Sequence, residues 1–353
     1  MNVMASIIAD EKMRSTSEEV PFVSVIIPVR NEEENIQRIL EQIFNQDYPA
    51  NHVEVIVVDG QSEDRTANIA SLFSINNRAP IVLRLSERGR AQGLNRGIMA
   101  AKGDVIVRLD ARTFISRDYI SRCVETLIKT SADNVGGIQR PIITMMNCQA
   151  AIGLAMCSPF GVGNAQFRLG RSSGPVESVY LGCFRRKIFE TVGLFDEQAA
   201  VISEDSDINQ RIREAGGIVY LNSKIESCFY PRETFSDFWR LYYRYGGARA
   251  GNLIKHKSLT SWRQVVPPVF LFAIVGSALL SLFNFFFVCI LFLILSTYVT
   301  VSLLISFVIA MKNKKLVLVP FLMCAFSCMH FGWALGFWKR LLIPEKEGRY
   351  WGN

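Results

Sequence analysis

The chain has 353 residues, of which 50% are hydrophobic, and a formal net charge of +7 at pH 7. This length suffices for one large domain and a further region. The eight cysteines form no CxxC pair and no cluster with histidines, which argues against a structural zinc site and is typical of a reducing compartment. Residues 1–20 are polar and are expected to be flexible; they lack the pattern of a signal peptide, so we expect the soluble part to be cytoplasmic.

Apolar runs alternate with helical patterns in the first third of the chain. Short runs bounded by polar turns, as expected for strands covered on both faces, occur at 21–29, 53–60, 81–85 and 104–110. Helices are expected between and after them, at 32–44, 88–103 and 118–129. Strands that alternate with helices imply right-handed crossovers and a mostly parallel α/β sheet.

The next hundred residues are less regular. A further strand is expected at 134–142. Residues 148–163 are apolar but short and interrupted by proline and glycine, so we expect a cleft-lining or interfacial helix there instead of a membrane span. Residues 177–197 indicate a strand, a glycine turn and a short basic helix, and residues 202–217 indicate a helix with acids in its first turn.

A membrane region follows. Residues 264–338 contain three lysines and no other charged residue, and three spans are expected, at 265–283, 288–310 and 316–338, within a transmembrane region at 264–340. If the soluble domain is cytoplasmic, the KNKK loop at 312–315 lies on the same side, as its positive charge favours. Three crossings would place the tail, 341–353, outside, which Lys339 and Arg340 disfavour. The alternative is a third segment that only dips into the membrane.

Residues 231–263 connect the expected soluble domain, 21–230, to the membrane region. They interleave aromatic and basic residues, with seven Lys or Arg against two acids between 232 and 263. This pattern is typical of an interfacial helix at the level of the lipid headgroups, whose arginines could meet anionic lipid or a phosphate-bearing ligand. A membrane-anchoring helix without a ligand role is the alternative.

Carboxylates occur where several expected strands end and where one helix begins. They are Glu32, Asp59, Asp110, Glu204 and Asp205. A single such acid is usually a cap or turn residue, but the carboxyl ends of parallel strands meet in one crevice, where ligands bind. A nucleoside diphosphate would suit it, because its base and ribose donate hydrogen bonds to carboxylates while its diphosphate needs a metal ion or arginines.

Six motifs resemble those of the family 2 glycosyltransferases. They are PVRNE (28–32), VVDGQSEDRT (57–66), GRAQGLNRG (89–97), LDAR (109–112), YLGCFRR…GLFDE (180–197) and SEDSD (203–207). Their order and spacing match over about residues 22–225. With its membrane region, the chain is similar to bacterial exopolysaccharide glucosyltransferases of the succinoglycan type. The resemblance implies a GT-A, Rossmann-like nucleotide-sugar fold, a UDP-sugar donor and inversion at the anomeric carbon.

The resemblance also implies roles for individual residues. The donor-binding residues would be Pro28, Arg30, Glu32, Asp59, Arg90, Asp110, Arg112 and Arg244. Among them, Asp59 would accept from uracil, and Asp110 would hold the ribose or the metal ion. Asp205 would be the general base, with Glu204 beside it as a second catalytic residue.

The sequence departs from the family pattern at two places. Where the family has Asp-x-Asp, this chain has Asp110-Ala111-Arg112, and arginine cannot ligate a metal ion. Either Asp110 and the diphosphate hold Mg²⁺ or Mn²⁺, as we expect, or Arg112 takes over part of its charge role. Where processive members have Gln-x-x-Arg-Trp, residues 241–245 read LYYRY, so Arg244 matches only in part and we expect a non-processive enzyme.

These expectations describe a glycosyltransferase of the bacterial inner membrane. It would move a sugar, glucose by resemblance, from a UDP-sugar to an undecaprenyl-diphosphate-linked oligosaccharide, beside membrane lipids and with no nucleic-acid partner. One alternative is a transferase that uses polyprenyl phosphate itself as the acceptor. The other is a catalytically degenerate membrane scaffold. A dehydrogenase is disfavoured, because no expected strand is followed by GxGxxG.

Overall fold

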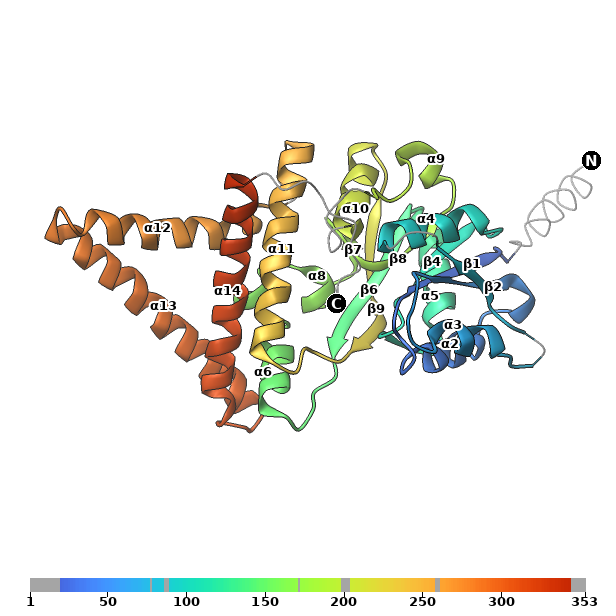
Figure 1. Cartoon of the computed structure of the whole chain (residues 1–353), viewed down its shortest axis with the longest axis horizontal. Coiled ribbons are helices and arrows are strands. Elements are labelled where there is room, and N and C mark those ends of the chain that lie inside the picture. The colour runs from blue at the N-terminus through green and yellow to red at the C-terminus, as the bar shows by residue number, and fades with distance from the viewer. Residues whose placement is uncertain are drawn as a thin grey trace, which may run out of the picture.

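The computed structural model of the chain describes residues 20–76, 78–85, 89–170, 172–197, 204–257 and 261–343. A nine-stranded sheet in the described part forms the centre of the N-terminal region, and long helices from the C-terminal third lie to one side of it (Figure 1). The α/β fold class is therefore confirmed, with a helical C-terminal region as expected.

The first four long strands are parallel, as predicted. They are β1 (Val23–Val29), β2 (Val53–Asp59), β3 (Ile81–Arg84) and β4 (Val105–Arg108), in the spatial order β3-β2-β1-β4. The connecting helices are α2 (Ile36–Phe44), α3 (Thr66–Leu72) and α4 (Arg90–Ala100); η1 (Ala50–His52) precedes β2. Each crossover helix returns the chain to the same end of the sheet, so the carboxyl ends of these strands lie along one edge.

Burial on both faces explains why these strands read as unbroken apolar runs. Val25 and Ile27 of β1 pack in one core with α2 and with α5 (Tyr119–Thr130), whereas Ile26 packs in a second core with α4. Alternate side chains of a strand point to opposite faces, so two apolar layers require apolar residues at every position.

The sheet is mixed beyond β4. There β8 (Tyr180–Arg185) is antiparallel to both β4 and β6 (Asn134–Pro141), and β6 is parallel to β9 (Val219–Phe229). Two short strands, β5 (Phe114–Ile115) and β7 (Gly174–Pro175), pair with β9. The strands expected at 134–142 and in 177–197 are confirmed, as are the helices α9 (Ile188–Val192) and α10 (Glu204–Glu214). Strand β9 was not predicted from the sequence, because its polar and apolar residues do not form a simple run.

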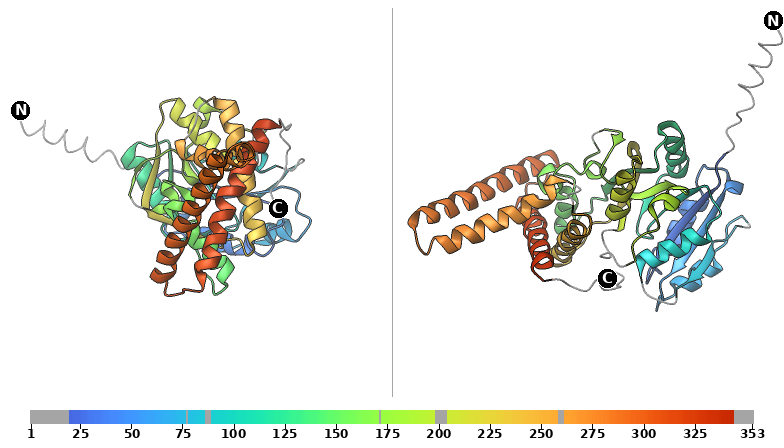
Figure 2. Two further views of the ribbon diagram at one scale, coloured as in Figure 1. Left: turned by 90° about the vertical axis from the view of Figure 1, so that its left-hand side faces the viewer. Right: turned by 90° about the horizontal axis from the view of Figure 1, so that it is seen from above.

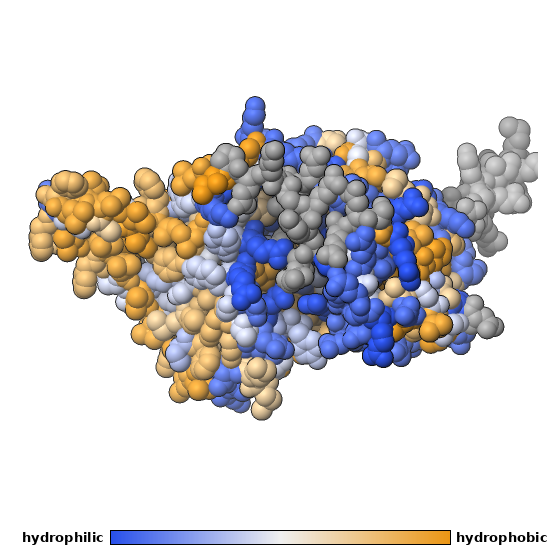
Figure 3. Space-filling model, viewed as in Figure 1, coloured by the Kyte–Doolittle hydropathy of each residue, from blue (hydrophilic) through white to orange (hydrophobic). Residues whose placement is uncertain are grey.

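Three C-terminal helices are long and apolar enough to cross a membrane. After α11 (Phe235–His256) and η2 (Trp262–Val265) come α12 (Val266–Leu280), α13 (Phe285–Lys312) and α14 (Leu318–Leu342). The candidate spans are Trp262–Leu280, Phe285–Lys312 and Leu318–Leu342. All three coincide with the expected segments, and the apolar surface on the left of the molecule belongs to this region (Figure 3).

The third of these helices is arranged differently from the other two. Helices α12 and α13 form a hairpin that projects away from the sheet, whereas α14 runs beside α11 (Figure 1, Figure 2). The α11–α14 contact is close: a Cβ added to Gly246 would overlap the Trp333 carbonyl oxygen, and one added to Gly336 would overlap that of Tyr243. The region expected to be a cleft-lining or interfacial helix forms α6 (Asn147–Ala155), α7 (Pro159–Val162) and α8 (Gln166–Leu169), and α6 packs in the same core as α14.

Candidate active site

Four of the residues proposed from the sequence lie together where β4 ends. Asp110 follows β4, Arg90 is the first residue of α4, and Glu204 and Asp205 begin α10. Arg90 forms an ion pair with Asp110, and its Nε lies 3.4 Å from the Glu204 carboxylate. The sheet therefore brings three segments that are far apart in the sequence to one point.

Arg108 lies at the centre of this cluster and was not proposed from the sequence. Its guanidinium forms an ion pair with Asp205, donates to Glu204 Oε1 at 2.9 Å, and lies 3.6 Å from Asp110 Oδ1. Only 2% of the side chain is exposed. The signal in the sequence was a cation inside an otherwise apolar strand, because burying such a charge is costly unless acids surround it.

The cluster shifts the pKa values of two carboxylates in opposite directions. Burial alone would raise the pKa of Asp110, but Arg90 and Arg108 hold it at about 2. Burial raises the pKa of Asp205 to about 7, because Arg108 offsets the effect only in part and the Glu204 and Asp110 carboxylates add to it. Environments that separate the pKa values of neighbouring acids assign them different chemical roles. Asp110 stays ionised, whereas Asp205 can take up a proton near neutral pH.

A second ion pair joins the segment after β1 to the segment after β4. Arg112 donates from Nε to Glu32 Oε1 at 2.8 Å and to Oε2 at 3.0 Å. Arg30 lies 3.6 Å from Glu63 in a weaker ion pair. Pro28 packs against α4: a Cβ added to Gly93 of that helix would lie 3.2 Å from the Pro28 Cβ. These residues are near the cluster in the sheet but are not part of its ion-pair network among the described residues.

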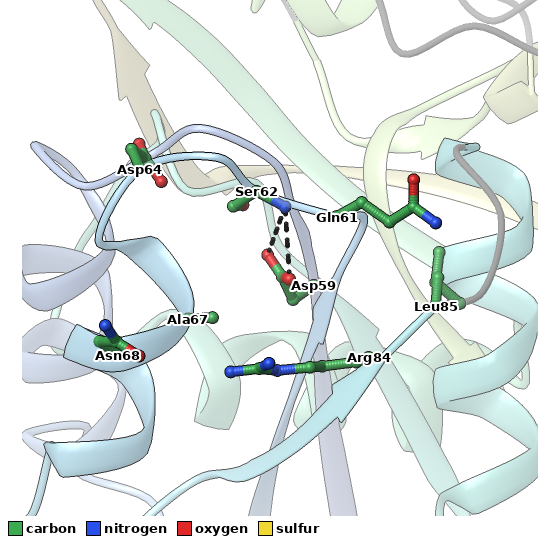
Figure 4. A pocket seen from close by; sticks show the side chains of 8 residues that line it. All are labelled: Asp59, Gln61, Ser62, Asp64, Ala67, Asn68, Arg84 and Leu85. Atoms are coloured by element: carbon green, nitrogen blue, oxygen red, sulfur yellow. Dashed lines mark hydrogen bonds between the residues drawn. The ribbon is translucent and has the colours of Figure 1, made fainter.

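Asp59 lines a pocket of its own at the end of β2. The pocket has a volume of about 360 Å³, and Asp59 points into it with both carboxylate oxygens 3.3 Å from the Ser62 backbone N–H (Figure 4). Its lining residues are Asp59, Gln61, Ser62, Asp64, Ala67, Asn68, Arg84 and Leu85. Because β1 separates β2 from β4 and neighbouring strands lie about 5 Å apart, the pocket is roughly 10 Å from Asp110 along the edge.

Comparisons with known proteins show which proteins the chain resembles. Residues 24–193 match the model of the family described as "Glycosyl transferase family 2". Residues 24–193, just under half of the chain, therefore correspond to a family 2 glycosyltransferase domain. The succinoglycan biosynthesis protein ExoA of Rhizobium meliloti (strain 1021) is 27% identical over 321 residues, which are 90% of this chain and 94% of that relative.

Two further matches extend over nearly the whole chain. A dolichyl N-acetyl-alpha-D-glucosaminyl phosphate 3-beta-D-2,3-diacetamido-2,3-dideoxy-beta-D-glucuronosyltransferase of Methanococcus voltae is 26% identical over 91% of this chain and 97% of its own length. Among solved structures, a mannosyltransferase from Pyrobaculum calidifontis in complex with GDP-Man and Mn²⁺ covers 93% of this chain and 89% of its own, with a TM-score of 0.61 and 21% identity. This likeness shows a shared GT-A fold. The chain is thus a membrane-associated glycosyltransferase related to transferases of exopolysaccharide and lipid-linked sugar synthesis.

The Asp110 carboxylate is suited to a divalent cation. Asp110 Oδ1 is buried and accepts no hydrogen bond from the described residues. No group of three or more His, Cys, Asp or Glu residues suited to a metal ion is found in the described ranges. A single carboxylate combined with substrate phosphates is a common way to hold Mg²⁺, so Asp110 fits an ion shared with a donor diphosphate. Arg112, which cannot ligate a metal ion, donates to Glu32 and not to Asp110.

Arg244 lies outside the carboxylate cluster. It is on α11, and burial followed by the like charge of Arg232 lowers its pKa. Within the described part of the chain, no hydrogen bond or ion pair joins Arg244 to the carboxylates of the glycosyltransferase domain. The diphosphate clamp implied by the resemblance therefore stays a prediction.

Proposed function

We propose that this glycosyltransferase moves a sugar from a UDP-sugar to a hydroxyl of a lipid-linked acceptor, with inversion and with Asp205 as the general base. The observation that carries the proposal is the contrast between Asp110, whose pKa is about 2, and Asp205, whose pKa is about 7, in one arginine-centred cluster. One acid is suited to hold charge at the donor and the other to accept a proton.

The donor would extend along the sheet edge. Asp59 would accept a hydrogen bond from the base in the pocket of about 360 Å³, and the diphosphate would reach the Arg90–Asp110 pair roughly 10 Å away. A divalent cation held by Asp110 and the diphosphate would neutralise charge on the leaving group. Glu32 is held in place by Arg112 and would contact the nucleoside from the end of β1.

The acceptor would approach Asp205 from the membrane side. Inversion needs one displacement: Asp205 removes the proton of the acceptor hydroxyl as that oxygen bonds to the anomeric carbon, and the diphosphate leaves from the opposite face. Asp205 keeps 24% of its side-chain surface exposed, against 6% for Glu204, so it is the more accessible of the two. Glu204 would hold Arg90 and Arg108 in position.

The names of the relatives support the substrate class. One relative is a succinoglycan biosynthesis protein and the other a dolichyl-phosphate-linked sugar transferase. We therefore propose a polyprenyl-linked acceptor, of the undecaprenyl diphosphate type, at the inner membrane of a bacterium, with glucose as the sugar.

The packing of α14 supports two crossings instead of three. The share of each candidate span that is buried inside the protein is 17% for the first, 6% for the second and 44% for the third. Trp338 and Trp333 of α14 donate to Pro268 O and Gln264 O, at the start of the first span. A helix held against α11 and against the start of the first span suits a position at the membrane–water interface. Two crossings also keep both the KNKK loop and Lys339 on the cytoplasmic side.

Protection against heat unfolding by a panel of nucleotides and nucleotide sugars, with and without Mn²⁺, tests the donor assignment. We expect UDP and one UDP-sugar to raise the Tm of the purified chain, and the Asp59→Ala variant to lose this selectivity for uracil. Equal protection by GDP and UDP would contradict the UDP assignment.

Release of UDP in membranes tests whether the chain is a catalyst. UDP formed from UDP-glucose and Mn²⁺ would exclude the scaffold alternative. Retained UDP binding with lost transfer in Asp205→Asn is expected for a hydroxyl acceptor. Undiminished transfer in that variant would favour polyprenyl phosphate as the acceptor, because a bare phosphate needs no base.

A further inference from the structure

The C-terminal end of α11 is fixed directly to the helix that carries Asp205. Asp207 of α10 has a fully buried side chain and accepts from Lys255 Nζ at 2.6 Å and pairs with His256 Nε2 at 2.9 Å. Lys255 also reaches Asp196 at 2.6 Å. Since Asp207 is two residues from Asp205, α11 runs past the proposed base on its way toward the membrane hairpin.

Arg249 lies on α11 about two turns before these contacts. Its Nη1 atom is buried and has no hydrogen-bond partner, and no ion pair joins it to any acid within the described ranges. Burial, followed by the like charge of Arg263, lowers the pKa of Arg249 to about 10, while Glu177 and Asp205 offset this only in part. Arg249 is therefore a partly buried cation whose buried Nη1 atom has no counterion of its own.

A second arginine, Arg263, lies close enough to Arg249 for the two like charges to interact. Arg263, in η2 just before α12, lies 3.5 Å from Glu177 and donates to Asn164 Oδ1. Glu177 is thus the acid that Arg263 already pairs with, so among the described residues Arg249 and Arg263 have one ion-paired carboxylate between them. Buried charges without a partner are strongly unfavourable, so a site with this imbalance is suited to an anion.

We propose that Arg249 and Arg263 bind the phosphate group of the lipid-linked acceptor. This inference rests on the proposed function and names the site at which its acceptor is held. Planar guanidinium groups match the geometry of phosphate oxygens. Arg249 is close enough to Asp205 and Arg263 to interact with their charges, and Arg263 directly precedes α12, which belongs to the first candidate membrane span. Binding there would place the first sugar of the acceptor next to the base.

The test uses the full chain in detergent, with a soluble isoprenoid diphosphate as the probe. Farnesyl diphosphate is titrated in the presence of saturating UDP, which fills the donor site, and the change in Tm is measured; farnesol, which has no phosphate, is the control ligand. The variants are Arg249→Gln, Arg249→Lys and Arg263→Gln. The matched control is Arg240→Gln, on the same helix, because the Arg240 side chain is 71% exposed and forms a loose ion pair with Asp237 at 3.6 Å.

The expected result is that protection depends on both the diphosphate of the probe and Arg249. Farnesyl diphosphate protects the wild type and Arg240→Gln, farnesol does not, and Arg249→Gln binds the probe about tenfold or more weakly, as loss of a charge-assisted hydrogen bond predicts. Arg249→Lys retains part of the binding. Without ligand, Arg249→Gln unfolds at an unchanged or higher temperature, because a charged group whose Nη1 atom is buried without a partner has been removed.

Three results would overturn the proposal. One is farnesyl diphosphate protection that is equal in Arg249→Gln and wild type, or equal to that of farnesol. Another is loss of UDP protection in Arg249→Gln, which would assign the pair to the donor diphosphate. The third is a large drop in the Tm of ligand-free Arg249→Gln, which would indicate a structural arginine. If no nucleotide protects the wild type, it is the proposed function that fails.

Discussion

Arg108 and Asp205 are 97 residues apart in the sequence and form an ion pair at the centre of the site. Arg108 comes from β4 and Asp205 from the start of α10, so the pair joins the donor side of the sheet to the proposed base. The same guanidinium also contacts Glu204 and Asp110. One cation thus holds three carboxylates that would otherwise repel one another.

Replacing Arg108 with glutamine should damage both stability and catalysis. Three acids would lose their shared cation, and breaking a buried ion pair costs about 3–5 kcal/mol. Arg108→Lys should retain part of the stability, because it keeps the charge but not the fork of donors. Denaturant unfolding measures the effect, and a loss below 1 kcal/mol in Arg108→Gln would contradict this role.

Transfer activity should rise with pH through neutrality. The pKa of Asp205 is raised to about 7, mainly by burial, so the base is protonated and inactive below that pH and ionised above it. We expect log(kcat/KM) to rise with unit slope up to about pH 7 and then level off. In Arg108→Lys the midpoint should move to higher pH if the ion pair weakens. A flat profile between pH 5 and 8 would argue against Asp205 as the base.

Asp207 should be important for stability without taking part in the chemistry. Its side chain is fully buried and contacts Arg211, Lys255 and His256. Burial alone would raise the pKa of Asp207, but its hydrogen bond to Lys255 and the charge of Arg211 lower it. The stabilisation is therefore present above about pH 4, the unfolded value, and is lost as the pH falls through the lower folded value.

At pH 7 we expect Asp207→Asn to destabilise the chain by about 3–5 kcal/mol. The matched control is Glu125→Gln, which removes an exposed carboxylate that pairs with Lys129 on the surface of α5 and should leave the Tm unchanged. Equal Tm values for the two variants would show that the α10–α11 contact does not stabilise the fold.

The contact between α11 and α14 should not tolerate a side chain at its glycines. A Cβ at Gly336 would overlap the Tyr243 carbonyl oxygen, so Gly336→Ala forces two helix backbones apart. We expect a loss of about 1–3 kcal/mol, as for other overpacked positions. Gly276→Ala on α12 is the control, because nothing lies within 4 Å of a Cβ there, and it should be neutral or slightly stabilising.

Cysteine labelling checks the same packing in membranes. With two crossings, a cysteine placed at Lys339 should react from the same side as one placed at Lys314, and one at Asn284, in the α12–α13 turn, from the other. Labelling of position 339 from the side of Asn284 would require that α14 crosses the membrane.

The sequence alone determined the α/β class, the strands β1, β2, β3, β4, β6 and β8, and the three apolar helices. These rest on local signals, because a strand buried on both faces must be apolar throughout and a membrane helix must be long and uncharged. It also singled out Asp110, Glu204, Asp205 and Arg90, which the fold brings together, and Asp59, which lines the pocket.

Only the tertiary structure decided which charges meet. The pairing of Arg108 with Asp205, the unpaired Nη1 of Arg249 and the packing of α14 on α11 all depend on residues about a hundred positions apart, or on glycines whose role is visible only when two helices touch. A pKa near 7 at Asp205 likewise results from burial and from neighbours on other segments, and no local pattern in the sequence encodes those distances.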